Sequence, residues 1–494
     1  MDIMYKSTRG NSRLYTASEA IIQGLSEDGG LFVPDTFPEA DFKLEELCAM
    51  DYKEIAYRVM RLFFTDFTQE ELRSCIDSAY DDKFDCKEIA PVSEACSAWF
   101  LELYHGATIA FKDMALSILP HLMITAAKKN NMTKDIVILT ATSGDTGKAA
   151  LAGFAGVKGT KIIVFYPKDG VSPIQKKQMI TQKGDNTFVV SVNGNFDDCQ
   201  SGVKRIFSDR QLASSLEEKG IMFSSANSIN IGRLVPQIVY YFYAYTVLVR
   251  RGVIKSGQKV NFTVPTGNFG NILAAYYASL LGLPVNRLIC ASNENKVLFD
   301  FFETGVYDRR REFVLTSSPS MDILISSNLE RLIYHICGND PKKCASLMND
   351  LSSEGSYEID QKMKEALSVF AAGYADESKT AQTIKDVFDS AGYLIDPHTA
   401  VAAGVYFEYR KAEADSTPTV IVSTASPYKF TGSVLRSIDP ALASDDDFEM
   451  ADRLSALSHV SVPEAVTSLK DAKILHTTTC EVKDMKDTVL SILA

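Results

Sequence analysis

The sequence predicts an α/β protein with two parallel-sheet lobes and a helical N-terminal domain. Three observations support this prediction. The chain has 494 residues, too many for one hydrophobic core of ordinary size. From about residue 135, short runs of β-branched residues alternate with helical stretches, which is typical of βαβ units. The first ninety or so residues lack this alternation and place their apolar residues at helical spacing.

The N-terminal domain is expected over residues 1–95. Ile55, Val59 and Leu62 recur at helical spacing within 52–64, which predicts a helix there. Thr68 and Glu71 have the spacing of a capping box, in which each side chain accepts a hydrogen bond from the other residue's backbone N–H. Both patterns favour helices over strands in this part of the chain.

A smaller α/β domain is expected over residues 131–234. Its strands are predicted at 136–140, 161–165 and 187–192, and its helices at 148–156, from 173 and after 197. Continuous apolar strands of this kind are buried on both faces, as in a parallel sheet covered by helices.

A larger α/β domain is expected to combine residues 96–130 with residues 235–440. Its strands are predicted at 260–264, 287–291 and 419–423, with a long helix from about 232 and another at 272–281. The charged and serine-rich stretch 304–320 is interpreted as a flexible insertion. Residues 441–494 show helical periodicity and are predicted to pack as a C-terminal helical segment on the larger domain. A cleft between two such lobes would bind its ligand at the carboxyl ends of strands.

Composition and charge restrict the class of function. Hydrophobic residues make up 46% of the chain and charged residues 23%, which is ordinary globular composition. The formal net charge of −12 argues against binding a nucleic acid. The nine cysteines include no C-x-x-C pair, and the sequence has neither a signal peptide nor a membrane span, so we expect a cytoplasmic protein. The six histidines are too scattered for a metal site, and no G-x-S-x-G nucleophile motif occurs.

Lys112 is the first candidate for chemistry. It follows Ile109, Ala110 and Phe111, so its amine would be partly desolvated. Desolvation lowers the pKa of a lysine, which a Schiff-base or general-base lysine requires. The alternative is a surface lysine paired with the adjacent Asp113 at the start of a helix.

The loop at 140–148 lies between a predicted strand and a predicted helix. Its glycines and hydroxyls would present free N–H groups to an anion at the helix N-terminus. The loop resembles a nucleotide P-loop superficially, but Thr142 and Ala149 stand where that motif needs glycine and a hydroxyl residue. A carboxylate or phosphate site and a tight turn without a ligand both remain open.

The loop at 265–271 also joins a predicted strand to a helix. Gly267 and Gly270 would allow its backbone to approach a phosphate, and the following helix would stabilise the negative charge. The loop does not match G-x-G-x-x-G, so a dinucleotide site is not indicated.

Together the three segments resemble the threonine synthase family, whose members are fold type II pyridoxal-phosphate enzymes. The motifs are H-G-A-T-I-A-F-K-D at 105–113, S-G-D-T-G at 143–147 and G-N-F-G-N at 267–271. Further matches are Y-K-S-T-R-G at 5–10, D-G-G-L-F-V-P at 28–34, A-N-S-I-N-I-G-R at 226–233 and S-T-A-S-P at 423–427. The resemblance therefore runs from about residue 5 to about residue 430. One departure is Ala107, where the family usually has proline.

The resemblance implies a role for each matching residue. Lys112 would hold pyridoxal 5'-phosphate as a Schiff base and act as the catalytic base. The cofactor phosphate would lie in the loop of Gly267, Asn268, Phe269, Gly270 and Asn271, and Thr424 would meet the pyridine nitrogen. The substrate carboxylate would be received by Ser143, Gly144, Asp145 and Thr146. The substrate phosphate would contact Asn227, Ser228, Asn230 and Arg233, although Arg233 could instead be a structural cation at the head of its helix.

The implied reaction converts O-phosphohomoserine and water to L-threonine and phosphate. The nearest alternative is a phospho-lyase that acts on the same substrate and releases 2-oxobutyrate. A nucleotide-binding protein is a remote alternative. The expected partner is a small-molecule substrate, without nucleic acid or membrane, and the expected state is a monomer or a homodimer.

Overall fold

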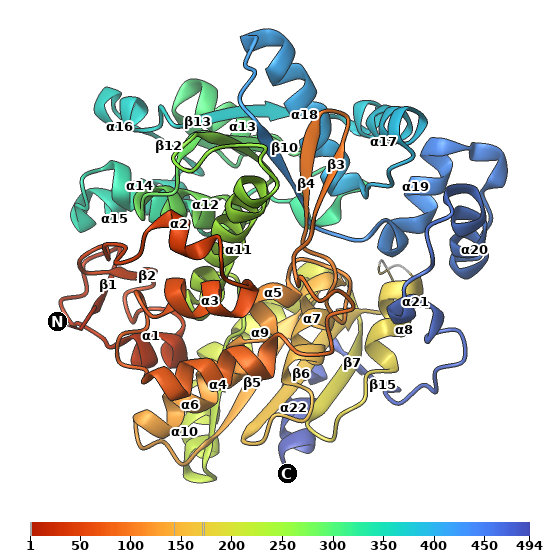
Figure 1. Ribbon diagram of the computed structural model, residues 1–494. Coiled ribbons are helices and arrows are strands. Elements are labelled where there is room, and N and C mark those ends of the chain that lie inside the picture. Colours follow the sequence, from red (N-terminus) through yellow and green to blue (C-terminus); the bar gives the residue numbers. More distant parts are fainter. Residues whose placement is uncertain (1, 143, 170, 172) are drawn as a thin grey trace.

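A computed structural model describes residues 2–142, 144–169, 171 and 173–494. Its two lobes are each built around a central sheet, the larger in the upper half and the smaller in the lower half of Figure 1. The larger sheet has the strand order β13-β10-β9-β14-β4-β3 and the smaller one β15-β7-β6-β5-β8. Neighbouring strands are parallel throughout, except that β3 is antiparallel to β4. The predicted α/β class with two parallel-sheet lobes is confirmed.

All six predicted strands are present, close to their predicted positions, and five further strands, β3, β4, β8, β13 and β15, were not predicted. Those of the larger sheet are β3 (Val92–Ala95), β4 (Ala98–Glu102), β9 (Val260–Pro265), β10 (Val285–Ser292), β13 (Phe370–Tyr374) and β14 (Thr419–Ser423). Those of the smaller sheet are β5 (Asp135–Ala141), β6 (Thr160–Pro167), β7 (Thr187–Asn193), β8 (Ile221–Ser224) and β15 (Thr478–Glu481). The central strands β9 and β14 are buried along their whole length, as expected of a sheet covered on both faces.

Helices cover both sheets. Those of the smaller lobe are α7 (Asp145–Phe154), α8 (Pro173–Ile180), α9 (Phe196–Ser208) and α10 (Arg210–Glu218). Those around the larger sheet are α5 (Asp113–Leu116), α6 (Leu119–Lys129), α11 (Ile231–Arg250), α12 (Gly270–Leu280), α13 (Val297–Thr304), α14 (Leu329–Ile336), α15 (Pro341–Ser353), α16 (Gln361–Ala366), α17 (Glu377–Ala391), α18 (Pro397–Glu413) and α19 (Thr431–Ile438). A small antiparallel pair, β11 (Val306–Asp308) with β12 (Ser356–Glu358), lies beside them.

The N-terminal region is mainly helical and packs against α11. Its elements are β1 (Tyr5–Ser7), α1 (Ala17–Gln23), β2 (Phe32–Pro34), α2 (Leu44–Leu47), α3 (Tyr52–Met60) and α4 (Gln69–Ala79). The predicted capping box is confirmed, because Thr68 Oγ1 accepts from the Glu71 amide and the Glu71 carboxylate accepts from the Thr68 amide. One hydrophobic core is continuous from α3 through the buried α11 to the larger sheet.

The C-terminal segment departs from the prediction. Its helices are α20 (Asp447–Ser458), α21 (Glu464–Thr467) and α22 (Met485–Leu493). α20 packs against α19 of the larger lobe and Val466 of α21 joins the same apolar cluster, whereas β15 pairs with β7 and α22 packs on α9 of the smaller lobe. The prediction of a helical segment on the larger lobe is therefore wrong for the last part of the chain. The physical reason is the open edge of β7, which pairs with a short polar strand that has no apolar pattern of its own.

The stretch 304–320, interpreted as a flexible insertion, is held by specific hydrogen bonds. Asn295 donates to the Val314 carbonyl at 2.7 Å and accepts from the Val314 amide at 3.0 Å. The Asp322 carboxylate accepts from the Thr316 amide at 3.0 Å and from its hydroxyl at 2.7 Å. These bonds hold the segment against the rest of the larger lobe and direct its end, Ser320, toward the cleft.

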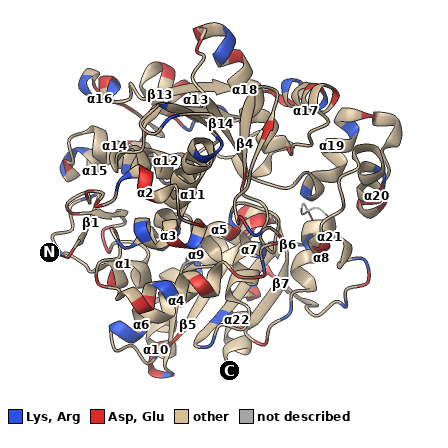
Figure 2. Cartoon of the chain, in the orientation of Figure 1, with Lys and Arg blue, Asp and Glu red and all other residues tan. Residues whose placement is uncertain are grey.

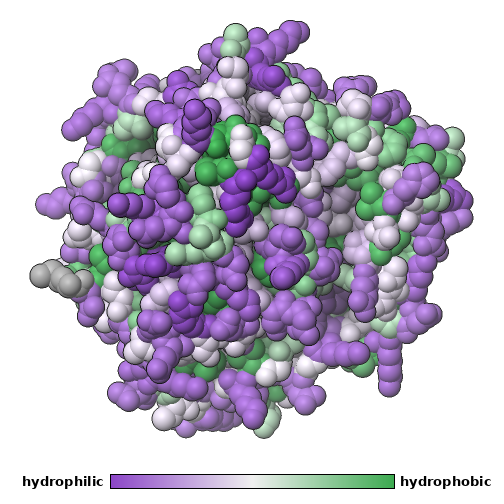
Figure 3. Space-filling model, viewed as in Figure 1, coloured by the Kyte–Doolittle hydropathy of each residue, from purple (hydrophilic) through white to green (hydrophobic). Residues whose placement is uncertain are grey.

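Charged residues of both signs are distributed over the molecule. Acidic and basic residues are interspersed along the chain in both lobes (Figure 2), and the face in Figure 3 is mostly hydrophilic with small scattered apolar patches. Among the described residues, no helix combines the length and the apolar content needed to cross a bilayer.

Candidate active site

A cavity of about 310 Å³ lies between the lobes at the ends of β5, β9 and β14. This is the position at which open parallel sheets bind their ligands. Its wall includes Lys112, the whole loop Gly267–Asn271 and Thr424, together with Thr146, Asn227, Ser228 and Arg233. Segments far apart in the sequence, all singled out by their motifs, thus meet in one cavity.

Lys112 is buried beside this cavity, with only 9% of its surface exposed. Its Nζ donates to Ser320 Oγ at 2.9 Å and lies 3.5 Å from Asp145 Oδ2. Burial lowers the pKa of Lys112, and the positive charges of Lys429 and Arg233 lower it further, against the opposing effect of Asp145. The alternative of a surface lysine paired with Asp113 is wrong, because Asp113 is buried and accepts from the Thr108 amide and hydroxyl.

Asp145 joins Lys112 to a second buried lysine. Its Oδ1 lies 3.1 Å from Lys429 Nζ and accepts from Gln175 at 2.7 Å, and its Oδ2 accepts from Ser320 Oγ at 3.0 Å. Burial acts to raise the pKa of Asp145, but Lys429 and Lys112 outweigh it and hold that pKa well below its usual range. The carboxylate is therefore charged, and it orients the Lys112 amine through Ser320.

The loop expected to receive the substrate carboxylate is partly in the cavity wall. Thr146, in the first turn of α7, lines the cavity. Gly144 has a φ of 148°, and the Thr142 hydroxyl accepts from its amide at 3.0 Å. Ser143 lies outside the described residues. The Thr142 hydroxyl also accepts from the Gly147 amide at 3.0 Å, and the Asp145 side chain turns to the lysines. Among the described residues, the amides of Asp145 and Thr146 thus remain as donors to an anion at the start of α7.

The loop from Gly267 to Asn271 has the geometry of an anion cradle. Phe269 adopts a left-handed φ of 64°, and α12 begins at Gly270, so the helix N-terminus faces the cavity. Asn271 Oδ1 accepts from the hydroxyls of Tyr240 and Tyr241 at 2.6 Å each. Its buried Nδ2 has no hydrogen-bond partner in the part of the chain that the structure describes, so it is a donor directed at a ligand.

Arg233, at the start of α11, is a buried cation in the cavity wall. Its Nη1 donates to the Ala226 carbonyl at 2.8 Å, while its buried Nε has no partner among the described residues. Burial lowers the pKa of Arg233 to about 10, so the group stays charged near neutral pH. A buried charge without a carboxylate beside it favours an anionic ligand over a purely structural role.

Asn230 is not brought to the cavity with its neighbours. Its Oδ1 accepts from the Gly232 amide at 2.8 Å and its Nδ2 donates to the Ile21 carbonyl at 2.9 Å. The side chain thus caps α11 and ties it to the N-terminal region, and it has no polar group left for a substrate.

Comparison with known proteins agrees with the family that the sequence motifs indicate, over nearly the whole chain. The family descriptions "Threonine synthase N terminus", "Pyridoxal-phosphate dependent enzyme" and "Threonine synthase, C-terminal" match residues 4–80, 88–425 and 399–478. Threonine synthase of Pseudomonas aeruginosa is 38% identical over 92% of this chain and 95% of its own length. The chain belongs to the threonine synthase family of pyridoxal-phosphate-dependent enzymes.

One solved structure and one further relative are also similar to this chain. The crystal structure of pyridoxal-phosphate-bound threonine synthase from Brucella melitensis has a TM-score of 0.88 and 34% identity, covering 99% of both chains. Human threonine synthase-like 1 is 41% identical over 85% of this chain, but the chain spans only 58% of that relative. The predicted fold type and the predicted cofactor are thereby confirmed.

The cavity residues of this family member fit pyridoxal phosphate. A Cβ at Gly267 would collide with the Ser320 carbonyl oxygen, so the cradle can close only around glycine. The unpartnered Asn271 Nδ2 and the N-terminus of α12 supply donors for a phosphate, and Lys112 supplies a buried amine. Thr424 lines the same cavity, and its carbonyl accepts from the Phe111 amide at 2.8 Å, which ties it to the Lys112 segment.

Sequence reasoning missed several residues that complete this site. Ser320 bonds Lys112, and its own amide donates to His398 Nε2 at 3.1 Å. His398 Nδ1 in turn bonds Asp396 at 2.6 Å, which fixes the ring with Nε2 as the acceptor. Lys429, which pairs with Asp145, lies two residues beyond the S-T-A-S-P motif, and the resemblance assigns it no role. None of these residues lies near Lys112 in the sequence, and no motif joins them, so only the fold could reveal them.

Proposed function

We propose that this chain is a threonine synthase that converts O-phosphohomoserine and water to L-threonine and phosphate. The observation that supports this most is Arg233, a buried and uncompensated cation in the same cavity as Lys112 and the 267–271 loop. The cavity thus offers one anion site at α12 and a second at Arg233. With the cofactor phosphate at the first site, the second is left for the phosphate of the substrate. The name of the Pseudomonas relative agrees with this proposal.

When bound, pyridoxal phosphate would supply an electron sink that makes acidic the proton on the amino-bearing carbon of the substrate and then a proton on the adjacent carbon. Lys112 would hold the cofactor and act as the base that moves these protons, because its lowered pKa favours the neutral amine. Thr424 is assigned to the pyridine nitrogen. A hydroxyl there, unlike a carboxylate, does not fix a full positive charge on the ring.

The charged neighbours of Lys112 keep its amine in place. Ser320 Oγ bridges Lys112 and Asp145, and Lys429 balances Asp145 from the other side. When Lys112 loses its proton, Asp145 therefore still has a cationic partner. Its charge remains stable through a catalytic cycle in which Lys112 changes its own.

The substrate anions are assigned to two further groups of donors. We assign the carboxylate to the start of α7, at Gly144 and Thr146 together with Ser143. We assign the substrate phosphate to Arg233, Asn227 and Ser228, which all line the cavity. Nine free cysteines support assignment of the enzyme to a reducing compartment, which we take to be the cytoplasm.

The test is product identification. Protein loaded with pyridoxal phosphate is incubated with O-phosphohomoserine, and phosphate, threonine and 2-oxobutyrate are quantified, with Lys112→Ala in parallel. Threonine and phosphate in equal amounts, lost in the variant, are expected. Release of 2-oxobutyrate would instead make the protein a phospho-lyase with the same cofactor. Absence of phosphate release by the loaded wild-type protein would reject the substrate.

A further inference from the structure

A second and larger hollow lies outside the active site. It is a groove of about 780 Å³ between α4 and α6 on one side and the smaller lobe on the other. Its smaller-lobe wall is formed by the end of α7 and the turn before β6, residues 152–159. Residues 132–135, where the chain crosses from α6 into β5, form its floor. The groove therefore lies at the junction between the lobes.

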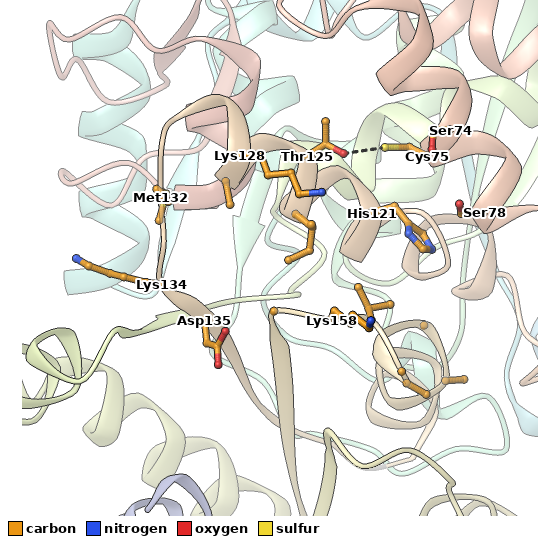
Figure 4. A pocket seen from close by; sticks show the side chains of 18 of the residues that line it. Ser74, Cys75, Ser78, His121, Thr125, Lys128, Met132, Lys134, Asp135 and Lys158 are labelled. Atoms are coloured by element: carbon orange, nitrogen blue, oxygen red, sulfur yellow. Dashed lines mark hydrogen bonds between the residues drawn. The ribbon is translucent and has the colours of Figure 1, made fainter.

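The charge of the groove is opposite to that of the chain. Among the described residues, four lysines and one carboxylate line it, although the chain has a net charge of −12. Figure 4 shows Lys128, His121 and Lys158 gathered around one opening, while Lys134 extends away from them and pairs with Glu217. Lys83 pairs with Asp81 at the rim. Neither Lys128 nor Lys158 has an ion-pair partner in the part of the chain that the structure describes.

The rest of the wall is mixed in polarity. Ile124, Met132 and Val157 give it apolar surface, and the hydroxyls of Ser74, Ser78 and Thr125 add hydrogen-bonding groups. Burial lowers the pKa of His121, aided by Lys83, so its neutral ring is a hydrogen-bonding partner near neutral pH. Such a wall suits a ligand with an anionic end and a partly apolar body.

We infer that this groove binds a phosphorylated metabolite of nucleotide size and regulates the enzyme through it. Its phosphate groups would lie between Lys128 and Lys158, which both line the groove. Its apolar part would contact Ile124, Met132 and Val157. The volume is more than twice that of the active-site cavity, which is larger than inorganic phosphate alone requires.

The groove is connected to the active site on two sides, through α7 and through α5 with α6. α7 has Asp145 and Thr146 at its first turn and reaches the groove at its other end. With ten residues it spans about 15 Å. On the other side, Lys112 leads through α5 into α6, whose last turn holds Lys128. α5 and α7 pack so closely that a Cβ at Gly153 would collide with the Leu116 carbonyl oxygen.

A ligand that draws the two walls of the groove together would therefore move α7 relative to α5. The 3.5 Å contact between Lys112 and Asp145 joins the opposite ends of these elements, so it would change as well. Regulation through the groove rests on the proposed function, whereas binding of the ligand does not depend on which product the enzyme makes.

The experiment measures binding to the pyridoxal-phosphate-loaded protein by calorimetry, with ATP and pyrophosphate as probes. Lys128→Glu/Lys158→Glu reverses the two unpaired charges. Lys204→Glu/Lys219→Glu makes the same charge change at two exposed lysines of the smaller lobe and serves as the matched control. Melting temperatures without probe verify that both variants fold. The absorption band of the bound cofactor reports on the active site.

ATP is expected to bind the wild-type protein and the control alike, and at least tenfold more weakly to Lys128→Glu/Lys158→Glu. ATP is also expected to shift the absorption band of the bound cofactor. Pyrophosphate is expected to bind more weakly than ATP, because it has no apolar part to contact Ile124, Met132 and Val157. Equal ATP affinity in all three proteins, or no binding of ATP to the wild type at millimolar concentration, would overturn the site. Binding at the groove with an unchanged cofactor band would overturn the regulatory coupling. Loss of threonine formation alone would concern only the proposed function.

Discussion

At the residue scale, two lysines and one aspartate form a buried cluster beside the active-site cavity, of which Lys112 lines the cavity itself. Lys112 and Lys429 both lie within 3.5 Å of Asp145, so one carboxylate balances two ammonium groups. Such an imbalance in a desolvated site favours loss of one proton. Lys429 donates to the Thr108 carbonyl and is the more enclosed of the two, whereas Lys112 faces the cavity. The excess charge thus favours a neutral amine at the position where a base is needed.

Asp145→Asn is expected to lower the pKa of Lys112 further, because Asp145 is the group that raises it. The acid limb of the kcat profile should therefore move to lower pH, and kcat should fall about 10- to 100-fold because the amine is less well oriented. The measurement is kcat against pH for the wild type and the variant. Asp487→Asn, at an exposed position of α22 outside both the cavity and the groove, is the control. An acid limb at the same pH in both proteins would show that Asp145 does not act on Lys112.

The contribution of His105 to the free energy of unfolding is expected to depend on pH. Burial opposes protonation, but Asp85 at 2.6 Å and Glu102 at 3.0 Å raise the pKa of His105 to about 9 from its ordinary 6.5. The charged ring therefore stabilises the fold fully below pH 6.5, and this contribution is lost as the pH rises through 9. Because Asp85 is exposed to solvent, we expect about 1–2 kcal/mol.

Urea unfolding of His105→Gln tests this expectation. The variant should be less stable than the wild type at pH 6 and nearly equal to it at pH 10. A difference that does not change between these two pH values would mean that the ring contributes by packing and not by its charge.

At the scale of elements, loops at strand ends form the site and the helices behind them hold those loops. The 267–271 loop joins β9 to α12, and its shape depends on contact with the 318–322 stretch, which approaches from a different part of the larger lobe. The tyrosines of α11 hold Asn271 from behind. The cradle for the cofactor is therefore a product of three separate segments, of which only one carries a recognisable motif.

Gly267→Ala is expected to weaken cofactor binding at least about tenfold, because the new methyl group displaces the Ser320 carbonyl and opens the cradle. Gly270→Ala is the matched control three residues away. Its Cβ would meet the side-chain amides of Asn328 at 3.4 Å and Gln237 at 3.8 Å, which are ordinary contact distances, and its φ is not in the left-handed region. Titration of the cofactor-free proteins with pyridoxal phosphate gives both affinities. Equal loss in the two variants would indicate general damage to the loop.

At the scale of the whole molecule, the end of the chain returns to complete the smaller lobe. β15 covers the edge of β7, and α22 packs on α9. The Met485 side chain is buried against Gly202, where a Cβ would collide with its sulfur. The lobe that contributes α7 to the active site is thus completed by residues more than 250 positions later in the chain.

Met485→Ala is expected to destabilise the smaller lobe by about 2–4 kcal/mol through the cavity that it leaves. Activity at low temperature should be retained, because the residue is far from the cleft, while the temperature of half-inactivation should fall. Exposed Leu475→Ala is the control. A variant as heat-stable as the wild type would show that the C-terminal helix does not hold the lobe together.

Much of the secondary structure and part of the active site could be predicted from patterns of residues that are close together in the sequence. β-branched runs predicted β5, β6, β7, β9, β10 and β14, because such continuous apolar runs are typical of strands buried on both faces. The capping box at Thr68 was readable because its two partners are three residues apart. Lys112 and the 267–271 loop were found because each motif is local and closely resembles the family pattern.

The tertiary structure decided whatever depends on partners that are distant in the chain. Ser320, His398 and Lys429 reach Lys112 and Asp145 from segments with no common motif, and β15 finds its place only because β7 has an open edge. Asn230 lies within a family motif, yet its side chain serves as a helix cap. The physical reason is that burial, charge balance and edge pairing are properties of a packed environment, whereas the sequence specifies directly only the interactions between near neighbours.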